Sequence, residues 1–369
     1  MLLGIISCTA IAQSATDAFN EGKRLLDDKK YNEAYAAFKN AVSKDASYKD
    51  ALYEAGWCAN ELEKYSEAVS YLQKAKNIDA DDEKVLFELG YAYKHLNKTT
   101  EAIAAFKKIL DLDPSYSDAS KYLGDIYYEK EEYETAFGYF KKYLEDEEAS
   151  NDYYYKAGWC ANDLGNYQQS IDYLAKYFPE EKEDKAKKFA EIGYANYKLE
   201  NGQAAVNFYK KALDEKPDYG TALRGLGDVY DEILKQNADA ITYYQMAVQK
   251  DVDNSKQCYY KLGWLYNDEE NYKDAVSILL KAVDYDDKDS EARVELGYAY
   301  YKLKNYETAL VQLKKATELD KDSKFGYYYQ GLCYIDMDQK TKAREVYNKL
   351  KTIDEEQAKK LLDKYNERN

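Results

Sequence analysis

The chain has 369 residues, among them 43 tyrosines but only 3 prolines and 17 glycines, and its formal net charge is −16. Proline and glycine are scarce where helices run long, so the composition predicts an all-helical protein and argues against a strand-rich domain. The negative charge argues against a nucleic-acid partner, because phosphates require a basic surface. It favours a basic or neutral partner, although such a charge also keeps a large surface soluble.

The N-terminal segment is apolar over residues 2–12. At ~1.5 Å per helical residue this run is too short to cross a ~30 Å hydrocarbon core, so no transmembrane span is expected. The ending Ala10-Ile11-Ala12 is typical of a secretory signal, so we predict a signal peptide over residues 1–12 with cleavage before Gln13. An alternative interpretation is a lipoprotein signal with a lipid anchor at Cys8. Either one predicts an exported protein, periplasmic or associated with the outer membrane.

Glycine then recurs at a nearly fixed spacing. Seven of the nine intervals are 34 residues, one is 35 and one is 36, and the glycines are Gly22, Gly56, Gly90, Gly124, Gly158, Gly193, Gly227, Gly263, Gly297 and Gly331. Most are followed twelve residues later by an alanine. Antiparallel helices that cross closely need small side chains at the crossing. Each interval therefore predicts two packed helices joined by a short turn, and Pro114 and Pro217 end two of the second helices.

This helix-turn-helix unit of 34 residues resembles the tetratricopeptide repeat over about residues 15–356. The resemblance implies an all-α, right-handed superhelical solenoid of ten helix-turn-helix repeats. We assign residues 13–356 to the solenoid and 357–369 to a C-terminal capping helix that covers the exposed end of the core. Some repeats depart from the pattern: the fifth has Ser170 and Tyr177 at small positions, and the seventh carries a one-residue insertion. Three others lack the tyrosine that most copies have before the second helix, and have Thr99, Gly202 or Lys340 there.

The repeats also follow a longer period. Tryptophan follows the glycine in the second, fifth and eighth repeats, tyrosine in the third, sixth and ninth, and aspartate in the fourth and seventh. This order predicts a block of three repeats that is present three times behind one leading repeat.

The resemblance implies that the first helix of each repeat lines a concave groove. Residues four and then three apart share one helix face, so three sets of tyrosine, tryptophan and asparagine are predicted there. The sets are Tyr53, Trp57 and Asn60; Tyr155, Trp159 and Asn162; and Tyr260, Trp264 and Asn267. Rings that bury side chains, beside an amide that pairs with backbone groups, suit an extended peptide. The alternative is that the aromatic residues pack between neighbouring first helices.

Carboxylates are expected close to this groove, and they are Glu61, Asp125, Asp163, Asp228 and Asp268. No catalytic constellation accompanies them. The single histidine, His95, forms neither a metal cluster nor a triad alone. Disulfides are not expected, because Cys58, Cys160 and Cys333 occupy one position in different repeats, whereas a disulfide needs Cα atoms within ~7 Å. These three cysteines and Cys258 are predicted to be buried free thiols.

The sequence therefore predicts a non-enzymatic scaffold or adaptor of the cell envelope, without metal or cofactor. It is expected to bind a protein or peptide partner, as an extended segment, in the groove. Two alternatives remain at this stage. Tryptophan and tyrosine platforms with asparagine also suit cell-wall carbohydrate, and the array alternatively serves as a structural spacer in a larger envelope assembly.

Overall fold

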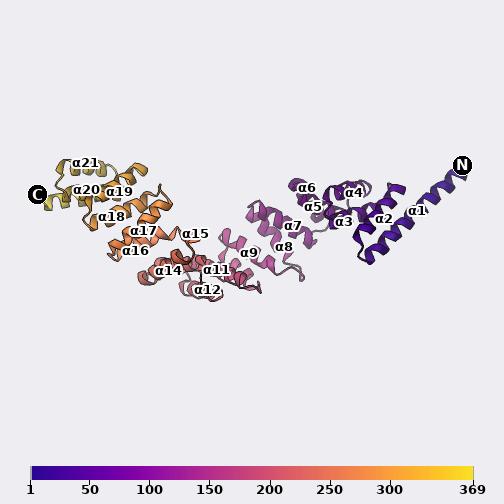
Figure 1. Cartoon of the computed structure of the whole chain (residues 1–369), viewed down its shortest axis with the longest axis horizontal. Helices are drawn as coiled ribbons and strands as arrows, with labels where there is room; N and C mark the ends of the chain where they lie inside the picture. Colours follow the sequence, from indigo (N-terminus) through magenta and orange to yellow (C-terminus); the bar gives the residue numbers. More distant parts are fainter. Residues whose placement is uncertain (1, 369) are drawn as a thin grey trace. The chain divides into compact units, whose positions relative to one another are not determined.

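The computed structural model describes the backbone of residues 2–368 and the side chains of residues 14–252 and 255–368. Its described residues form helices and turns, without a strand. The chain divides into two compact units, Met1–Tyr177 and Phe178–Asn369. Within each unit, helices that are consecutive in the chain pack against each other (Figure 1). The predicted all-helical repeat fold is confirmed.

The first unit contains five helix pairs, which correspond to the first five predicted repeats. Its helices are α1 (Leu2–Asp27), α2 (Tyr31–Lys44), α3 (Lys49–Glu61), α4 (Tyr65–Ile78), α5 (Glu83–His95), α6 (Thr99–Leu112), α7 (Ser117–Glu129), α8 (Tyr133–Tyr143), α9 (Asp152–Asp163) and α10 (Tyr167–Ala175). α10 has 9 residues where α2 has 14, so the fifth repeat, with Tyr177 at a small position, has a shortened second helix. The first unit ends at this residue.

The second unit contains the remaining repeats and a final helix. Its helices are α11 (Lys182–Lys198), α12 (Gly202–Glu215), α13 (Gly220–Asp228), α14 (Asn237–Lys250), α15 (Val252–Ser255), α16 (Cys258–Asp268), α17 (Tyr272–Tyr285), α18 (Ser290–Lys302), α19 (Tyr306–Leu319), α20 (Lys324–Asp336), α21 (Lys340–Lys351) and α22 (Glu355–Glu367). α22 packs against α20 and α21 and begins two residues before the predicted capping segment.

The N-terminal segment continues into the first repeat without a break, because α1 runs from Leu2 to Asp27. The side chains of Cys8 and Gln13 lie outside the described residues, so the lipid anchor and the cleavage point stay predictions. Among the described residues, no helix has both the length and the apolar character that crossing a membrane requires.

The recurrent glycines make room for large side chains of the second helix. A Cβ atom at Gly56 would lie 2.4 Å from Cγ of Leu72, and one at Gly90 would lie 2.7 Å from Cζ of Phe106. Leu72 and Phe106 are fully buried. In each of the first nine repeats, the space beside the glycine is occupied in this way by a leucine, phenylalanine or tyrosine of the following helix. The glycines therefore set how closely the two helices of a repeat approach.

A left-handed residue ends the first helix of each repeat. Positive φ angles occur at Lys29, Glu63, Asn97, Glu131, Gly165, Glu200, Lys235, Glu270, Lys304 and Asp338. The following amide closes the turn, as where the N–H of Lys64 donates to the carbonyl of Ala59 at 2.7 Å. This pattern is the Schellman motif, which satisfies carbonyl groups at a helix end.

The insertion in the seventh repeat forms a π-helical turn at Val229–Ile233. The N–H of Gln236 donates to the carbonyl of Tyr230, six residues back, where the equivalent bond in the other repeats spans five. One added residue in a helix produces such a turn, because it shifts the hydrogen bonds from i−4 to i−5. The predicted insertion is thereby confirmed and located.

The packing of the glycines predicts opposite effects for two substitutions in the first unit. Gly56→Ala drives its methyl group into the buried Leu72, and overpacking of this kind costs about 1–3 kcal/mol. Gly138→Ala on α8 places a methyl group in open space and gains about 1 kcal/mol of helix propensity. Urea unfolding followed by circular dichroism measures both effects, and stabilisation by both variants would contradict this account of the glycines.

Candidate functional site

The three predicted tryptophans lie at equivalent places on α3, α9 and α16. Trp264 is 40% exposed, whereas Trp57 and Trp159 are half-buried. Trp57 lies beside Tyr31, with ring centroids 6.1 Å apart, and Trp159 lies beside Tyr133 at 4.8 Å. Trp57 and Trp159 are thus each partly covered by a tyrosine of the preceding repeat, whereas Trp264 is open to solvent.

The three predicted tyrosines pack within the array. Tyr53 contacts the core of the first unit, Tyr260 contacts the core of the second, and the ring of Tyr155 lies 5.4 Å from that of Tyr177. Burial raises the pKa of the Tyr53 and Tyr260 hydroxyls. These positions agree with the alternative in which aromatic residues pack between helices, and a ligand-binding role for the tyrosines stays a prediction.

The expected exposure of the asparagines is wrong. Asn60, Asn162 and Asn267 are only 3%, 4% and 4% exposed. Asn60 Nδ2 donates to the carbonyl oxygen of Glu88 at 3.1 Å and to its Oε2 at 2.7 Å. Asn267 makes the same two bonds to Glu295, at 3.1 and 2.8 Å. The amide is therefore covered by the first helix of the next repeat, which helical spacing within one repeat does not reveal.

The carboxyl groups that receive these bonds are themselves largely buried. Burial raises the pKa of Glu88 to about 7, opposed by the hydrogen bond from Asn60 and reinforced by the charge of Glu61. Burial likewise raises the pKa of Glu295. Both side chains lie in places that favour a neutral acid or a nearby positive charge.

The carboxylates expected near the groove have different surroundings. Asp125 Oδ1 lies 2.6 Å from the ammonium of Lys156, and Asp228 Oδ1 lies 2.7 Å from that of Lys261. These two aspartates therefore form ion pairs between adjacent repeats. The other three, Glu61, Asp163 and Asp268, are exposed.

The three-repeat period corresponds to three kinds of contact between adjacent first helices. One is the amide to carboxyl pair described above, and the second is the ion pair. The third joins two tyrosine rings, with centroids 6.0 Å apart for Tyr91 and Tyr122 and 4.8 Å for Tyr298 and Tyr329. In each case the second partner stands two residues before the glycine of the next repeat.

A cavity of about 210 Å³ lies among α16, α18 and α20 of the second unit. Its lining residues are Trp264, Asn267, Asp268, Glu270, Tyr272, Glu295, Tyr298 and Tyr329. The cavity contains two of the predicted site residues, Trp264 and Asn267, but not Tyr260. The structure thus brings part of the predicted set together with aromatic and acidic residues of the next two repeats.

The first unit carries an equivalent set of eight residues. Each number is lower by 207 (264 − 57 = 207), and the set is Trp57, Asn60, Glu61, Glu63, Tyr65, Glu88, Tyr91 and Tyr122. The only change of residue type is Glu61 in place of Asp268. The equivalent positions around Trp159 differ at two places, where Gly165 and Gly225 replace a glutamate and a tyrosine.

The sequence interpretation missed five of these eight positions in the second unit, namely Glu270, Tyr272, Glu295, Tyr298 and Tyr329, as cavity residues. Comparison of residues 207 positions apart could have identified them, because the residue types agree there. The agreement extends over about two thirds of the three-repeat block and is not confined to one helix. A helix-face argument restricted to one repeat does not reach residues that the following repeats supply.

In both units, a nitrogen-containing side chain packs against two tyrosine rings of the set. In the first, the His95 ring is centred 4.5 Å from both Tyr65 and Tyr91. In the second, the ammonium of Lys302 lies 5.1 Å from the ring centre of Tyr272 and 5.7 Å from that of Tyr298. His95 is therefore a packing partner of two rings.

The cysteines are buried and free, as predicted. Burial raises the pKa of Cys58, Cys160, Cys258 and Cys333 to about 12 in each case. Thiols in this state are poor nucleophiles. Within the described residues, no three histidine, cysteine or acidic side chains gather in a way that could hold a metal ion.

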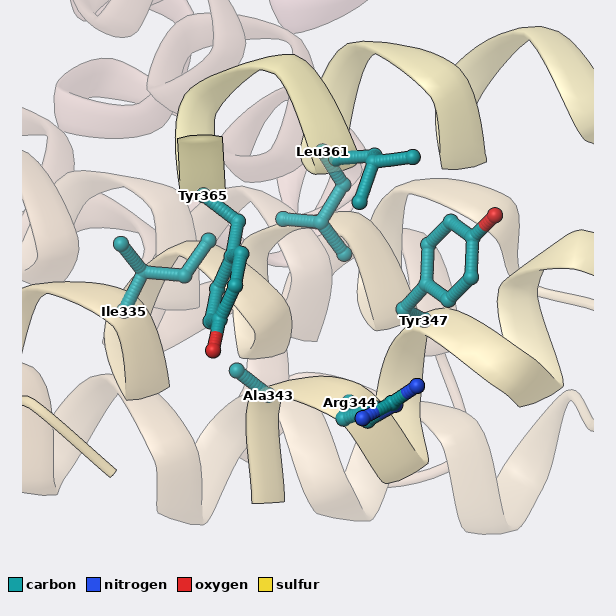
Figure 2. Close-up of a pocket in the computed structure, with 7 residues that line it drawn as sticks. Ile335, Ala343, Arg344, Tyr347, Leu361 and Tyr365 are labelled. Carbon is teal, nitrogen blue, oxygen red and sulfur yellow. The ribbon is translucent and has the colours of Figure 1, made fainter. Parts of the chain in front are cut away.

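A larger cavity, of about 380 Å³, lies beside the C-terminal helix (Figure 2). It forms because Leu361 of α22 occupies the space beside Gly331, which in the other repeats belongs to a residue of the second helix. Tyr347, the residue at that place in α21, lines the cavity instead, together with Ile335, Ala343, Arg344, Leu362 and Tyr365. The cavity is therefore explained by how the array ends.

The raised pKa of Glu88 predicts a loss of stability with increasing pH. The pKa of Glu88 is about 7 in the folded state and near 4.5 in the unfolded state. Between these pH values the folded state holds the proton and the unfolded state does not. The stabilisation is therefore complete below pH 4.5 and is lost as the pH rises through 7, by up to about 3 kcal/mol. Glu88→Gln keeps an acceptor for Asn60 and is expected to remove this dependence and to exceed the wild type in stability at pH 8.

Urea unfolding at several pH values tests this prediction, with Glu63→Gln, which changes an exposed carboxylate, as the control. A Glu88→Gln variant with the same pH dependence as the wild type would contradict the assigned burial.

The tryptophan environments predict different accessibility to quenchers. In variants that retain a single tryptophan, acrylamide is expected to quench Trp264 at least twice as efficiently as Trp57 or Trp159, because only Trp264 is substantially exposed. Fluorescence titration measures the constants, and equal quenching of all three would contradict the described burial.

Models of the tetratricopeptide repeat match residues 25–86, 87–153, 152–180 and 191–255, together more than half of the chain. A model described as anaphase-promoting complex, cyclosome, subunit 3 matches residues 268–350. No curated protein matches the chain.

Solved structures with similar folds include repeat proteins. YrrB, described as a TPR protein with an unusual peptide-binding site, is 27% identical over 50% of this chain and 95% of its own, with a TM-score of 0.47. MamA from Desulfovibrio magneticus RS-1 is 21% identical over 47% of this chain and 97% of its own, with a TM-score of 0.43. The TPR domain of P58(IPK) is 16% identical over 88% of this chain and 99% of its own, with a TM-score of 0.31.

Proposed function

Because the chain belongs to the tetratricopeptide-repeat family, we propose that it is a non-enzymatic scaffold or adaptor of the cell envelope that binds an extended protein segment. Repeat arrays of this kind expose long surfaces that suit segments of other proteins. The observation that carries the proposal is the cavity beside Trp264, together with the second copy of its eight residues around Trp57.

The arrangement suits recognition of side chains along a segment. Trp264 presents an open aromatic surface, while Asn267 and Glu295 behind it are held by their mutual hydrogen bonds. Such a site needs little reorganisation on binding, which limits the entropic cost of association. An open aromatic residue above fixed polar groups is the usual composition of a binding site for one side chain.

Export is part of the same proposal and rests on the apolar N-terminal segment. Cleavage before Gln13 would retain Ala15 and Ala18, which are the first buried residues among the side chains that the structure describes. Lipidation of Cys8 instead would attach the array to a membrane surface.

The proposal predicts that partner binding depends on the three tryptophans. In the variant W57A/W159A/W264A, the amount of partner protein crosslinked in the native envelope is expected to fall at least tenfold. The helical circular dichroism of the variant is expected to stay unchanged. The control is I78A/Y285A/V311A, which truncates three exposed apolar residues on second helices.

Mass spectrometry identifies the crosslinked protein, and quantitative blotting compares the variants. Equal capture by both triple variants, or a crosslinked glycan in place of a protein, would overturn the proposal.

A further inference from the structure

The cavity beside Trp264 is lined almost entirely by hydrogen-bond acceptors and aromatic faces. Asp268, Glu270 and Glu295 supply carboxyl groups, and Trp264 and Tyr329 supply rings. Carboxylates attract a cation by charge, and the faces of aromatic rings attract it through their quadrupole. The lining therefore suits a positively charged hydrogen-bond donor.

A buried acceptor beside this cavity has no donor among the described residues. Asn267 is 4% exposed and its Oδ1, which is shielded from solvent, has no hydrogen-bond partner there. The orientation of the amide is fixed, because its Nδ2 bonds to the backbone carbonyl of Glu295, which only accepts. A buried acceptor without a donor is destabilising, so a positive charge near this wall of the cavity is favourable. The acceptors that line the cavity for an occupant are the carboxyl groups of Asp268, Glu270 and Glu295.

The charges that face the cavity leave room for a second cation. Lys302 lies over Tyr272 and Tyr298, which shows that these rings accept a positive charge. Asn237 donates to Asp268 at 2.8 Å without neutralising it. The lining of the cavity thus contains three carboxyl groups and no lysine or arginine, and burial together with the charge of Glu291 raises the pKa of Glu295 against the hydrogen bond from Asn267.

We propose that this cavity binds the guanidinium group of an arginine side chain from the bound protein segment. The inference rests on the proposed function and adds the chemical class of the side chain that is recognised. A planar guanidinium stacks on rings and offers forked donors, here to the carboxyl groups of Glu295 and Asp268. The volume of about 210 Å³ is below the usual range for small-molecule ligands and suits one long side chain.

The first unit carries the same recognition chemistry. Asn60 Oδ1 is likewise buried without a donor among the described residues, and Glu88 replaces Glu295. The set around Trp159 keeps its asparagine and two carboxyl groups, but Gly225 replaces one tyrosine and Gly165 replaces one glutamate. The chain therefore has two complete arginine sites, and the incomplete set around Trp159 is expected to bind more weakly.

The test uses full-length protein labelled with 5-fluorotryptophan, whose three ¹⁹F resonances are assigned by single Trp→Phe variants. The probe is a glycine and serine peptide with one central arginine, and its control carries citrulline, which has the same shape without the charge. Saturable shifts of the Trp57 and Trp264 resonances are expected with the arginine peptide, with at least tenfold weaker binding of the citrulline peptide. The Trp159 resonance is expected to respond only at higher concentrations of the arginine peptide than the other two.

Variants assign the effect to individual sites. D268N/E295Q is expected to weaken binding at least tenfold at Trp264 without changing the response of Trp57, and E61Q/E88Q is expected to do the reverse. Helical circular dichroism and the ¹⁹F shift of the tryptophan in the mutated unit without peptide report that this unit keeps its fold, and the unaffected site reports that the other unit does. Glu270→Gln, at an exposed turn residue, is a milder variant with an expected loss of about threefold.

Agmatine distinguishes a free cation from a protein segment, because it carries the guanidinium without a peptide backbone and is expected to bind at least tenfold more weakly. Absent or equal responses to arginine and citrulline, equal binding of agmatine, or unchanged affinity in both double variants would overturn the arginine sites. Tryptophan-dependent capture of a partner would then still support the proposed function, so the two failures are distinguishable.

Discussion

Each of the first nine repeats depends on one packing contact, in which a large side chain of the second helix fills the space that a glycine leaves on the first. At Gly56 that side chain is Leu72, and at Gly90 it is Phe106. Because the contact fixes the distance between paired helices, it also fixes how the first helices of successive repeats meet. The amide, ring and ion pairs between repeats, and the cavity beside Trp264, follow from that placement.

Much of the fold could be predicted from the sequence, because it is repeated ten times. The glycine spacing identified the paired helices, and the departures at Tyr177 and in the seventh repeat marked a shortened helix and a π-helical turn. The left-handed turn residues could not be predicted, since nine of the ten are not glycine. Their conformation is imposed by the packing of the helices on either side, which local preference does not reveal.

The candidate site was only partly predictable. Helical spacing placed Trp264 and Asn267 on one face correctly, but it could not show that the next repeat covers the asparagine. The partner of that asparagine, Glu295, stands in the next repeat, and the residues around it in the sequence do not mark it as part of a site. Burial between repeats depends on the distance between helices, whereas a helix-face argument uses only angles about one axis.

The alternation of three kinds of contact restricts how such an array can change length. Loss of the third repeat alone would place Asn60 opposite Tyr122, whose ring offers no carboxyl group to the buried amide. Loss or gain of three repeats keeps each buried amide opposite a glutamate and each paired aspartate opposite a lysine. A change of length by the triplet, about a hundred residues, therefore preserves these contacts, whereas a change by one repeat does not.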